Sequence, residues 1–164
     1  MKSISIVSPV NGIVTDIDND TITIYIRPAD NHDIYSPIDG ILVDILNYQG
    51  SWHRHIFYAD VNKNARTTIS IKNQYLNKPI SFWLEVGRPK YITDRISLNK
   101  NINDNIYQGE NIGEIVLGSL AEVHFNSIKH YKTIAKGSIL IGGQTLIAYV
   151  LLPSDKKKIR NMMY

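Results

Sequence analysis

The chain has 164 residues, a length typical of one domain that buries a full hydrophobic core without disulfides or metals. Hydrophobic residues make up 43% and charged residues 20%, which excludes intrinsic disorder. The absence of cysteine excludes disulfide scaffolds, zinc–thiolate sites and thiol catalysis. The longest apolar stretch, residues 139–152, is broken by glycines and is shorter than the ~18 residues of a membrane span, and we see no signal peptide.

The net charge of +3 belongs to the C-terminal end. Residues 154–164 contain three lysines and one arginine against one aspartate, so residues 1–153 are neutral. A neutral body has no electrostatic footprint for nucleic acid, so we expect no nucleic-acid partner. We expect one domain over residues 1–153 and a solvated basic tail over 154–164, which allows a peripheral contact with an anionic membrane. The many isoleucines and asparagines are typical of an AT-rich genome, such as that of a large virus, a parasite or an endosymbiont.

The hydrophobic pattern favours strands almost everywhere. Residues 21–27 and 67–72 alternate polar and apolar positions, as half-buried strands do. Apolar runs over residues 80–86, 115–125 and 139–152 indicate strands buried on both faces. Turn-forming residues separate these segments, and the spacing predicts an all-β sandwich or barrel.

The chain also repeats itself. Residues 6–17 (IVSPVNGIVTDI) and 34–45 (IYSPIDGILVDI) share seven of twelve residues at an offset of 28. Each copy contains Ser-Pro-x-x-Gly, in which proline fixes φ and glycine opens the backbone, so each is a turn that leads into a strand. Residues 108–113 and 136–142 look like a second pair of related turns. We therefore expect a pseudo-twofold sandwich of duplicated hairpins.

Folds of this kind hold lipoyl and biotinyl carriers, sugar-phosphotransferase domains, some zinc peptidases and pyruvoyl-dependent decarboxylases, and the fold alone does not choose among them. A carrier needs a lysine presented at a hairpin tip, and Lys72, Lys100 and Lys136 lack the flanking residues for that. A zinc peptidase needs a His/Asp/His set, whereas His53 and His55 form only a His-x-His pair that an exposed loop explains better. The chain has no Gly-x-Ser-x-Gly elbow, so nothing indicates a serine hydrolase of that type.

Five stretches along residues 6–125 occur in the same order as the motifs of a known family. They are SPVNG (8–12), IRPADNHDIYSPIDG (26–40), QGSWHR with NAR (49–54 and 64–66), LEVG (84–87) and QGENIGEIVLGS (108–119). Together they resemble the phosphatidylserine decarboxylase family, most closely its short, pyruvoyl-dependent form. The resemblance implies an all-β, duplicated barrel-sandwich hybrid with little or no helix.

The resemblance also implies particular chemistry. Ser119 would attack the carbonyl of Gly118, the chain would split there, and Ser119 would become a pyruvoyl group, the cofactor of decarboxylation. His32 stands at the family position of the proton shuttle. The implied substrate is an aminophospholipid such as phosphatidylserine, or a related amine. A cytoplasmic or peripheral membrane protein is expected, without a metal, and a homo-oligomer is left open.

Ala65 replaces the glutamate of the family's Asn-Glu-Arg, and two positions of the self-cleavage machinery also depart from the family pattern. The aspartate that orients the cleavage base is Asn11 here, and the base itself, a histidine, is Tyr35. Tyrosine, with a pKa of ~10, is a poor base near neutral pH. Asp39 occupies the equivalent turn of the second repeat and could supply an acid from across the twofold. Two hypotheses follow: a self-cleaving pyruvoyl-dependent decarboxylase, and a non-cleaving homologue that acts as a binding or structural module.

Overall fold

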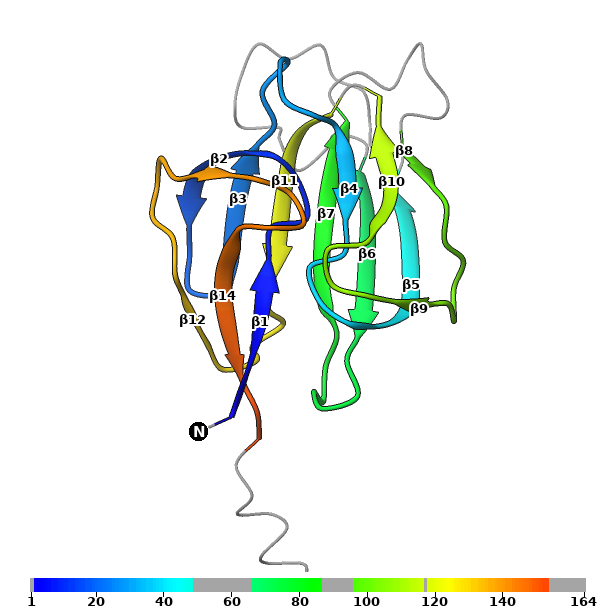
Figure 1. Cartoon of the computed structure of the whole chain (residues 1–164), viewed down its shortest axis with the longest axis vertical. Coiled ribbons are helices and arrows are strands. Elements are labelled where there is room, and N and C mark those ends of the chain that lie inside the picture. Colours follow the sequence, from blue (N-terminus) through cyan, green and yellow to red (C-terminus); the bar gives the residue numbers. More distant parts are fainter. Residues whose placement is uncertain (1, 49–65, 87–95, 117, 154–164) are drawn as a thin grey trace, which may run out of the picture.

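The computed structural model describes residues 2–48, 66–86, 96–116 and 118–153, and every regular element in them is a strand (Figure 1). Along the first half these are β1 (Ser3–Val7), β2 (Gly12–Ile17), β3 (Thr21–Tyr25), β4 (Asp33–Tyr35), β5 (Gly40–Tyr48), β6 (Arg66–Lys72) and β7 (Ile80–Val86). Then follow β8 (Ile96–Leu98), β9 (Asn105–Ile106), β10 (Asn111–Ile115), β11 (Gly118–His124), β12 (His130–Lys132), β13 (Ile139–Leu140) and β14 (Leu146–Leu151). The expectation of an all-β chain is confirmed.

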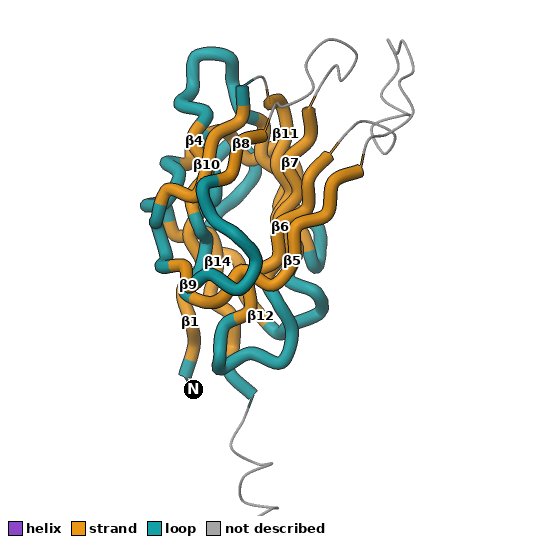
Figure 2. The backbone as a smooth tube through the Cα atoms, turned by 90° about the vertical axis from the view of Figure 1, so that its right-hand side faces the viewer, coloured by secondary structure: helices purple, strands orange, loops and turns teal. Residues whose placement is uncertain are grey.

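The described strands form one large antiparallel sheet and two small ones. The large sheet has the order β13-β2-β3-β11-β7-β6-β5-β9, and the small sheets have the orders β1-β14-β12 and β4-β10-β8. Figure 2 shows β4, β10 and β8 as a second layer that faces the β7-β6-β5 side of the large sheet. Figure 1 shows β1 and β14 in the corresponding place on the other side. This is the expected duplicated barrel-sandwich arrangement.

The order of the large sheet reflects the sequence repeat. From its centre outward, β11-β3-β2-β13 on one side matches β7-β6-β5-β9 on the other. One half of the fold takes β1–β3 and β11–β14, and the other takes β4–β10, so the second half is one continuous segment inserted into the first. The predicted pseudo-twofold symmetry is confirmed.

The two Ser-Pro turns accept hydrogen bonds from two equivalent glycine turns, and these are not the pair of turns that the sequence predicted. The N–H of Gly143 donates to the carbonyl of Ser8, and the N–H of Gly109 donates to that of Ser36, both at 2.8 Å. Gly109 and Gly143 also share positive φ values of 79° and 74°. The counterpart of the turn at 108–109 is therefore 142–143, and the predicted match with residues 136–142 is wrong. Gly137 also has a positive φ, but it lies in a different turn, before β13.

One hydrophobic core lies between the layers, and isoleucine dominates it. The alternating segments behave as predicted, because β3 buries Ile22 and Ile24 and β6 buries Ile69 and Ile71. β-Branched side chains suit this place, since they pack well on a pleated surface with one buried face.

The prediction that the apolar runs are buried on both faces is wrong for residues 115–125 and 139–152, whereas in residues 80–86 the consecutive Ile80, Ser81 and Phe82 are all buried. β11 buries Ala121 and Val123, whereas Glu122 and His124 on its other face stay partly exposed. The run over residues 139–152 is in addition two strands, β13 and β14, with a turn between them. An antiparallel sheet with one face in the core leaves the other face to polar side chains, and the glutamate and histidine in these runs follow that rule.

Gly12 and Gly40 begin equivalent strands where a neighbouring strand comes closest. A Cβ at Gly12 would overlap the carbonyl of Tyr25, and one at Gly40 would overlap that of Lys72. We expect Gly40→Ala to lower the free energy of unfolding by about 1–3 kcal/mol, because the backbone must shift to admit the methyl group. Urea unfolding measures the loss, with Val43→Ala on the exposed side of β5 as the control. A loss no larger than that of the control would contradict this account.

Candidate active site

The end of β10 and the start of β11 lie beside the loop between β3 and β4. The N–H of Ile115, the last residue of β10, donates to the carbonyl of His32 at 2.9 Å. β11 then begins at Gly118 and pairs with β3 through Leu120 and Tyr25. The ladder between β11 and β7 shifts register between Gly118 and Leu120, so residue 119 falls at an irregularity of the sheet. The end of β10 thus contacts His32, three residues before the predicted cleavage bond, while the side chain of Ser119 lies outside the described part.

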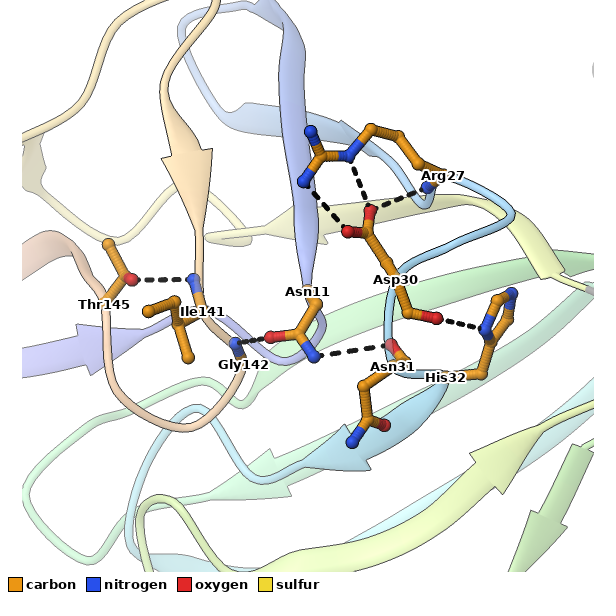
Figure 3. A network of polar contacts seen from close by, with 8 residues as sticks. All are labelled: Asn11, Arg27, Asp30, Asn31, His32, Ile141, Gly142 and Thr145. Carbon is orange, nitrogen blue, oxygen red and sulfur yellow. Dashed lines mark hydrogen bonds and ion pairs between the residues drawn. The ribbon is translucent and has the colours of Figure 1, made fainter.

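The His32 side chain is held in one orientation (Figure 3). Its Nδ1 lies 2.7 Å from the main-chain carbonyl oxygen of Asp30. A carbonyl oxygen can only accept, so Nδ1 carries the hydrogen and Nε2 of the neutral ring carries the lone pair. Nε2 is therefore the atom through which His32 can take up or return a proton.

Asp30 is itself clamped by Arg27. The Nε and Nη2 of Arg27 donate to the two carboxylate oxygens of Asp30, each at 2.9 Å, and the Arg27 main-chain N–H adds a third bond of 2.9 Å. The Arg27 hydrogen bond lowers the pKa of the Asp30 carboxyl below its usual value. The reverse contact with Asp30 raises the pKa of Arg27. Charge-assisted, bidentate pairs of this kind are the strong ones, so the loop is firmly closed.

Asn11 joins the first Ser-Pro turn to the same loop. Its Oδ1 accepts from the N–H of Gly142 at 2.6 Å, and its Nδ2 donates to the carbonyl of Asn31 at 3.4 Å (Figure 3). Asn11 therefore lies next to the His32 loop. Both ends of its amide are engaged, and an amide carries no charge to stabilise an imidazolium.

Asp39 is the counterpart of Asn11 in the second repeat. Its Oδ1 accepts from the N–H of Gln108 at 2.6 Å, just as Asn11 accepts from Gly142. Its carbonyl accepts from the side chain of Asn73 at 2.9 Å. These described bonds all lie in the second half of the fold, and none joins Asp39 to the His32 loop. The equivalence does show that an aspartate fits this type of turn.

Tyr35 fills the space beside the turn at 142–143. A Cβ at Gly142 would come within 2.7 Å of the tyrosine ring and one at Gly143 within 2.9 Å, so only glycine fits there. The Tyr35 hydroxyl donates to Asp33 at 3.5 Å. Burial raises the pKa of Tyr35 above its ordinary value, and the negative charge of Asp33 raises it further. A raised pKa makes the tyrosinate scarcer near neutral pH and Tyr35 a still poorer general base.

The raised pKa of Tyr35 predicts a loss of stability in alkali. The unfolded chain releases this proton near pH ~10, whereas the folded chain holds it to higher pH, so the free energy of unfolding falls as the pH rises above about 10. Tyr35→Phe removes the hydroxyl and should flatten that fall. Urea unfolding at about pH 8 and about pH 10.5 measures it, with the exposed Tyr107→Phe as the control. Equal alkaline losses in Tyr35→Phe and the unmodified chain would contradict the prediction.

Comparison with known proteins shows the family of the chain. The sequence model of phosphatidylserine decarboxylase matches residues 2–148. The chain belongs to the phosphatidylserine decarboxylase family. Relatives from Methanosarcina mazei, Methanosarcina acetivorans and Methanosarcina barkeri, each provisionally named an archaetidylserine decarboxylase proenzyme, are 30%, 30% and 32% identical to it over 146 residues. That is 88% of this chain and 66%, 66% and 68% of theirs, so the chain spans about two thirds of their length.

The outer face of the large sheet of this decarboxylase-family protein carries a second group of polar side chains. The Arg66 guanidinium lies 4.1 Å above the ring of Trp83, and the His124 ring stacks on that ring at 4.2 Å. The Nε2 of His124 lies 3.2 Å from a Glu122 carboxylate oxygen, close enough for an ion pair but without hydrogen-bond geometry. A shallow hollow of about 170 Å³ opens here, lined by Thr23, Arg66, Trp83, Glu85, Leu120, Ala121 and Glu122.

Some predicted features of this decarboxylase-family chain lie outside the described residues. They include His53 and His55, the stretch at 49–54 and the basic tail at 154–164. Within the described ranges, no three His, Asp or Glu side chains gather closely enough to hold a metal ion. In those same ranges no helix is long and apolar enough to cross a membrane.

The sequence interpretation missed two parts of this site. One is the role of Arg27, for which the only signal was an Arg-Pro-x-Asp spacing that suits a turn closed by its own ion pair. The other is the pair Gly142 and Gly143, which contact Asn11 and Tyr35. Adjacent glycines after a strand signal a tight turn, but they do not say which distant residues it will meet.

Proposed function

We propose that the protein is the proenzyme of a pyruvoyl-dependent decarboxylase, that it cleaves itself between Gly118 and Ser119, and that it acts on the amino headgroup of an aminophospholipid. Membership of the phosphatidylserine decarboxylase family supports the reaction class. The observation that carries the proposal is the irregular start of β11 at this bond, three residues after Ile115 contacts the carbonyl of His32.

The proposed maturation uses only the chain and water. Ser119 Oγ attacks the carbonyl carbon of Gly118, and the acyl group moves from nitrogen to oxygen to give an ester. Loss of the Ser119 Cα proton expels the Gly118 carboxylate and splits the chain. Water then displaces the nitrogen as ammonia and leaves a pyruvoyl group at residue 119. Glycine suits the first step, because without a Cβ it admits a close approach of the hydroxyl.

The chain's own residues then have separate tasks. The pyruvoyl carbonyl supplies an electron sink that side chains lack. His32, whose Nδ1 hydrogen is tied to Asp30, offers Nε2 to return a proton to the substrate carbon after carbon dioxide leaves.

A second Gly-Ser pair provides an internal comparison. The N–H of Ser138 donates to the carbonyl of Ala135 at 3.0 Å, and its Oγ accepts from the Ala135 N–H at 3.1 Å. Gly137 and Ser138 therefore form an ordinary closed turn whose hydroxyl already has a partner. Gly118 and Ser119 stand instead where regular strand pairing is interrupted.

A second candidate function is a homologue that never cleaves and serves as a binding or structural module. The contacts of Asn11 and Tyr35 favour it. Asn11 uses both ends of its amide in structural bonds, and Tyr35 packs its ring against a glycine turn. Neither side chain provides a base near neutral pH.

The intact mass of the purified chain under denaturing conditions separates these functions. Our proposal expects fragments of residues 1–118 and 119–164, the second blocked to N-terminal sequencing. Fragments of residues 1–137 and 138–164 would refute the assignment of Ser119. A single uncut chain would refute self-cleavage and favour the module.

The substrate class needs its own assay. The names of the relatives add archaetidylserine to phosphatidylserine as a candidate, and the two share the serine headgroup. Release of labelled carbon dioxide from vesicles of either lipid, compared with free serine, measures the preference. Release from free serine alone would contradict a lipid substrate.

A further inference from the structure

The loop between β3 and β4 is built around the orientation of one carbonyl group. The N–H of Asp30 donates to the carbonyl of Arg27 at 3.0 Å and closes a turn. The Asp30 carboxylate then reaches back to the Arg27 guanidinium and main-chain N–H through three bonds of 2.9 Å. Both ends of Asp30 are thereby fixed, and its remaining main-chain group, the carbonyl, points to Nδ1 of His32 (Figure 3).

The segment after Asp30 is braced as well. The Oδ1 of Asn31 accepts from the N–H of Asp33 at 2.6 Å, and the carbonyl of Asn31 accepts from Asn11. The carbonyl of His32 accepts from Ile115. These bonds hold the backbone after Asp30, and the Arg27 clamp holds Asp30 itself, so the direction of the Asp30 carbonyl depends on both.

We propose that Arg27 is a positioning residue for His32: by holding the Asp30 carboxylate, it aims the Asp30 carbonyl at Nδ1 and keeps the lone pair of the imidazole on Nε2. The value of that lone pair for decarboxylation rests on the proposed function. The positioning itself is a property of the folded chain. A neutral histidine side chain in water prefers the hydrogen on Nε2, so a ring held in the opposite form needs a fixed acceptor at Nδ1.

Arginine suits this task better than lysine. Its planar guanidinium meets both carboxylate oxygens at once, whereas an ammonium is a point charge on a flexible stem. The Asp30 side chain is 12% exposed and that of Arg27 is 38% exposed, so the pair is partly shielded from water. We therefore expect Arg27→Lys to restore only part of what Arg27→Met removes.

The test is the tautomer of His32 in the full chain. Two-bond ¹H–¹⁵N correlation spectra of ¹⁵N-histidine-labelled protein distinguish Nδ1–H from Nε2–H, and His32→Gln assigns the signal. At about pH 8, above the ordinary imidazole range, the unmodified chain should show the Nδ1–H form. Arg27→Met should lower the ratio of Nδ1–H to Nε2–H about two- to tenfold, the loss expected when one hydrogen bond weakens. Asp30→Asn should shift the ratio in the same direction.

Lys100→Met is the matched control, because it removes another surface ion pair, with Glu110 at 2.7 Å, away from this loop. It should leave the tautomer unchanged. An unshifted tautomer in Arg27→Met, with dispersed amide signals that show a folded chain, would overturn the proposal. If the chain cleaves, Arg27→Met should also lower kcat about tenfold with little change in KM. A chain that never cleaves would refute the proposed function, and the tautomer ratio would then decide the role of Arg27 by itself.

Discussion

Ser119→Ala is expected to leave the chain uncut and without decarboxylase activity. Alanine has no hydroxyl to attack the Gly118 carbonyl, so neither the ester nor the pyruvoyl group can form. Intact mass measures the cut, and carbon dioxide release from serine-headgroup lipid measures the activity. Both should be lost together, because the cut and the cofactor come from the same serine.

Ser138→Ala is the matched control for that experiment. It changes the same residue type in the same Gly-Ser context, but in a closed turn where the hydroxyl only accepts a bond from Ala135. It should cleave like the unmodified chain. Cleavage that survives Ser119→Ala and stops in Ser138→Ala would contradict our assignment.

Asn11→Asp combined with Tyr35→His is expected to accelerate self-cleavage by about 10²–10⁴-fold, the usual contribution of a positioned general base. Asp39 shows that an aspartate fits the turn, because its carboxylate already accepts from Gln108 as Asn11 accepts from Gly142. The space now filled by the Tyr35 ring admits the smaller imidazole. The new carboxylate could then orient that ring and stabilise its charged form.

The two single variants are the controls for this pair. Asn11→Asp alone gains an acid without a base to orient, and Tyr35→His alone gains a base without its partner, so each should fall well short of the double variant. A time course of intact mass under native conditions gives the rates. If the folded double variant cleaves no faster than the unmodified chain, these positions do not limit cleavage.

Asn11 and Asp39 occupy equivalent turns but have different neighbours. Both Ser-Pro turns are built in the same way, and both side chains at the fourth turn position accept a main-chain N–H. Only the first turn, however, adjoins the loop that carries His32, through Nδ2 of Asn11 and the carbonyl of Asn31. The symmetry of the fold thus produces two similar turns, but only Asn11 of the first turn bonds to the loop that carries His32.

The amino-acid sequence by itself determined the all-β class, the duplication and the family. These depend on short-range regularities: alternation over residues 21–27, the repeat of residues 6–17 at 34–45, and the ordered stretches that end at Gly118 and Ser119. The side-chain period of a strand is two, so alternation identifies a half-buried strand wherever the chain places it.

Only the tertiary structure decided which residues meet. Asn11 and Gly142 are 131 positions apart, and Asp39 and Gln108 are 69 apart, so no local pattern links them. The misaligned second turn and the wrongly predicted two-sided burial of β11 have the same cause. A glycine or an apolar run in the sequence indicates only the local backbone conformation. Which turns are equivalent, and which face of a strand is exposed, depends on the segments that pack against them. The contact between the Asp30 carbonyl and Nδ1 of His32 likewise depends on the path of the backbone, which no local sequence pattern shows.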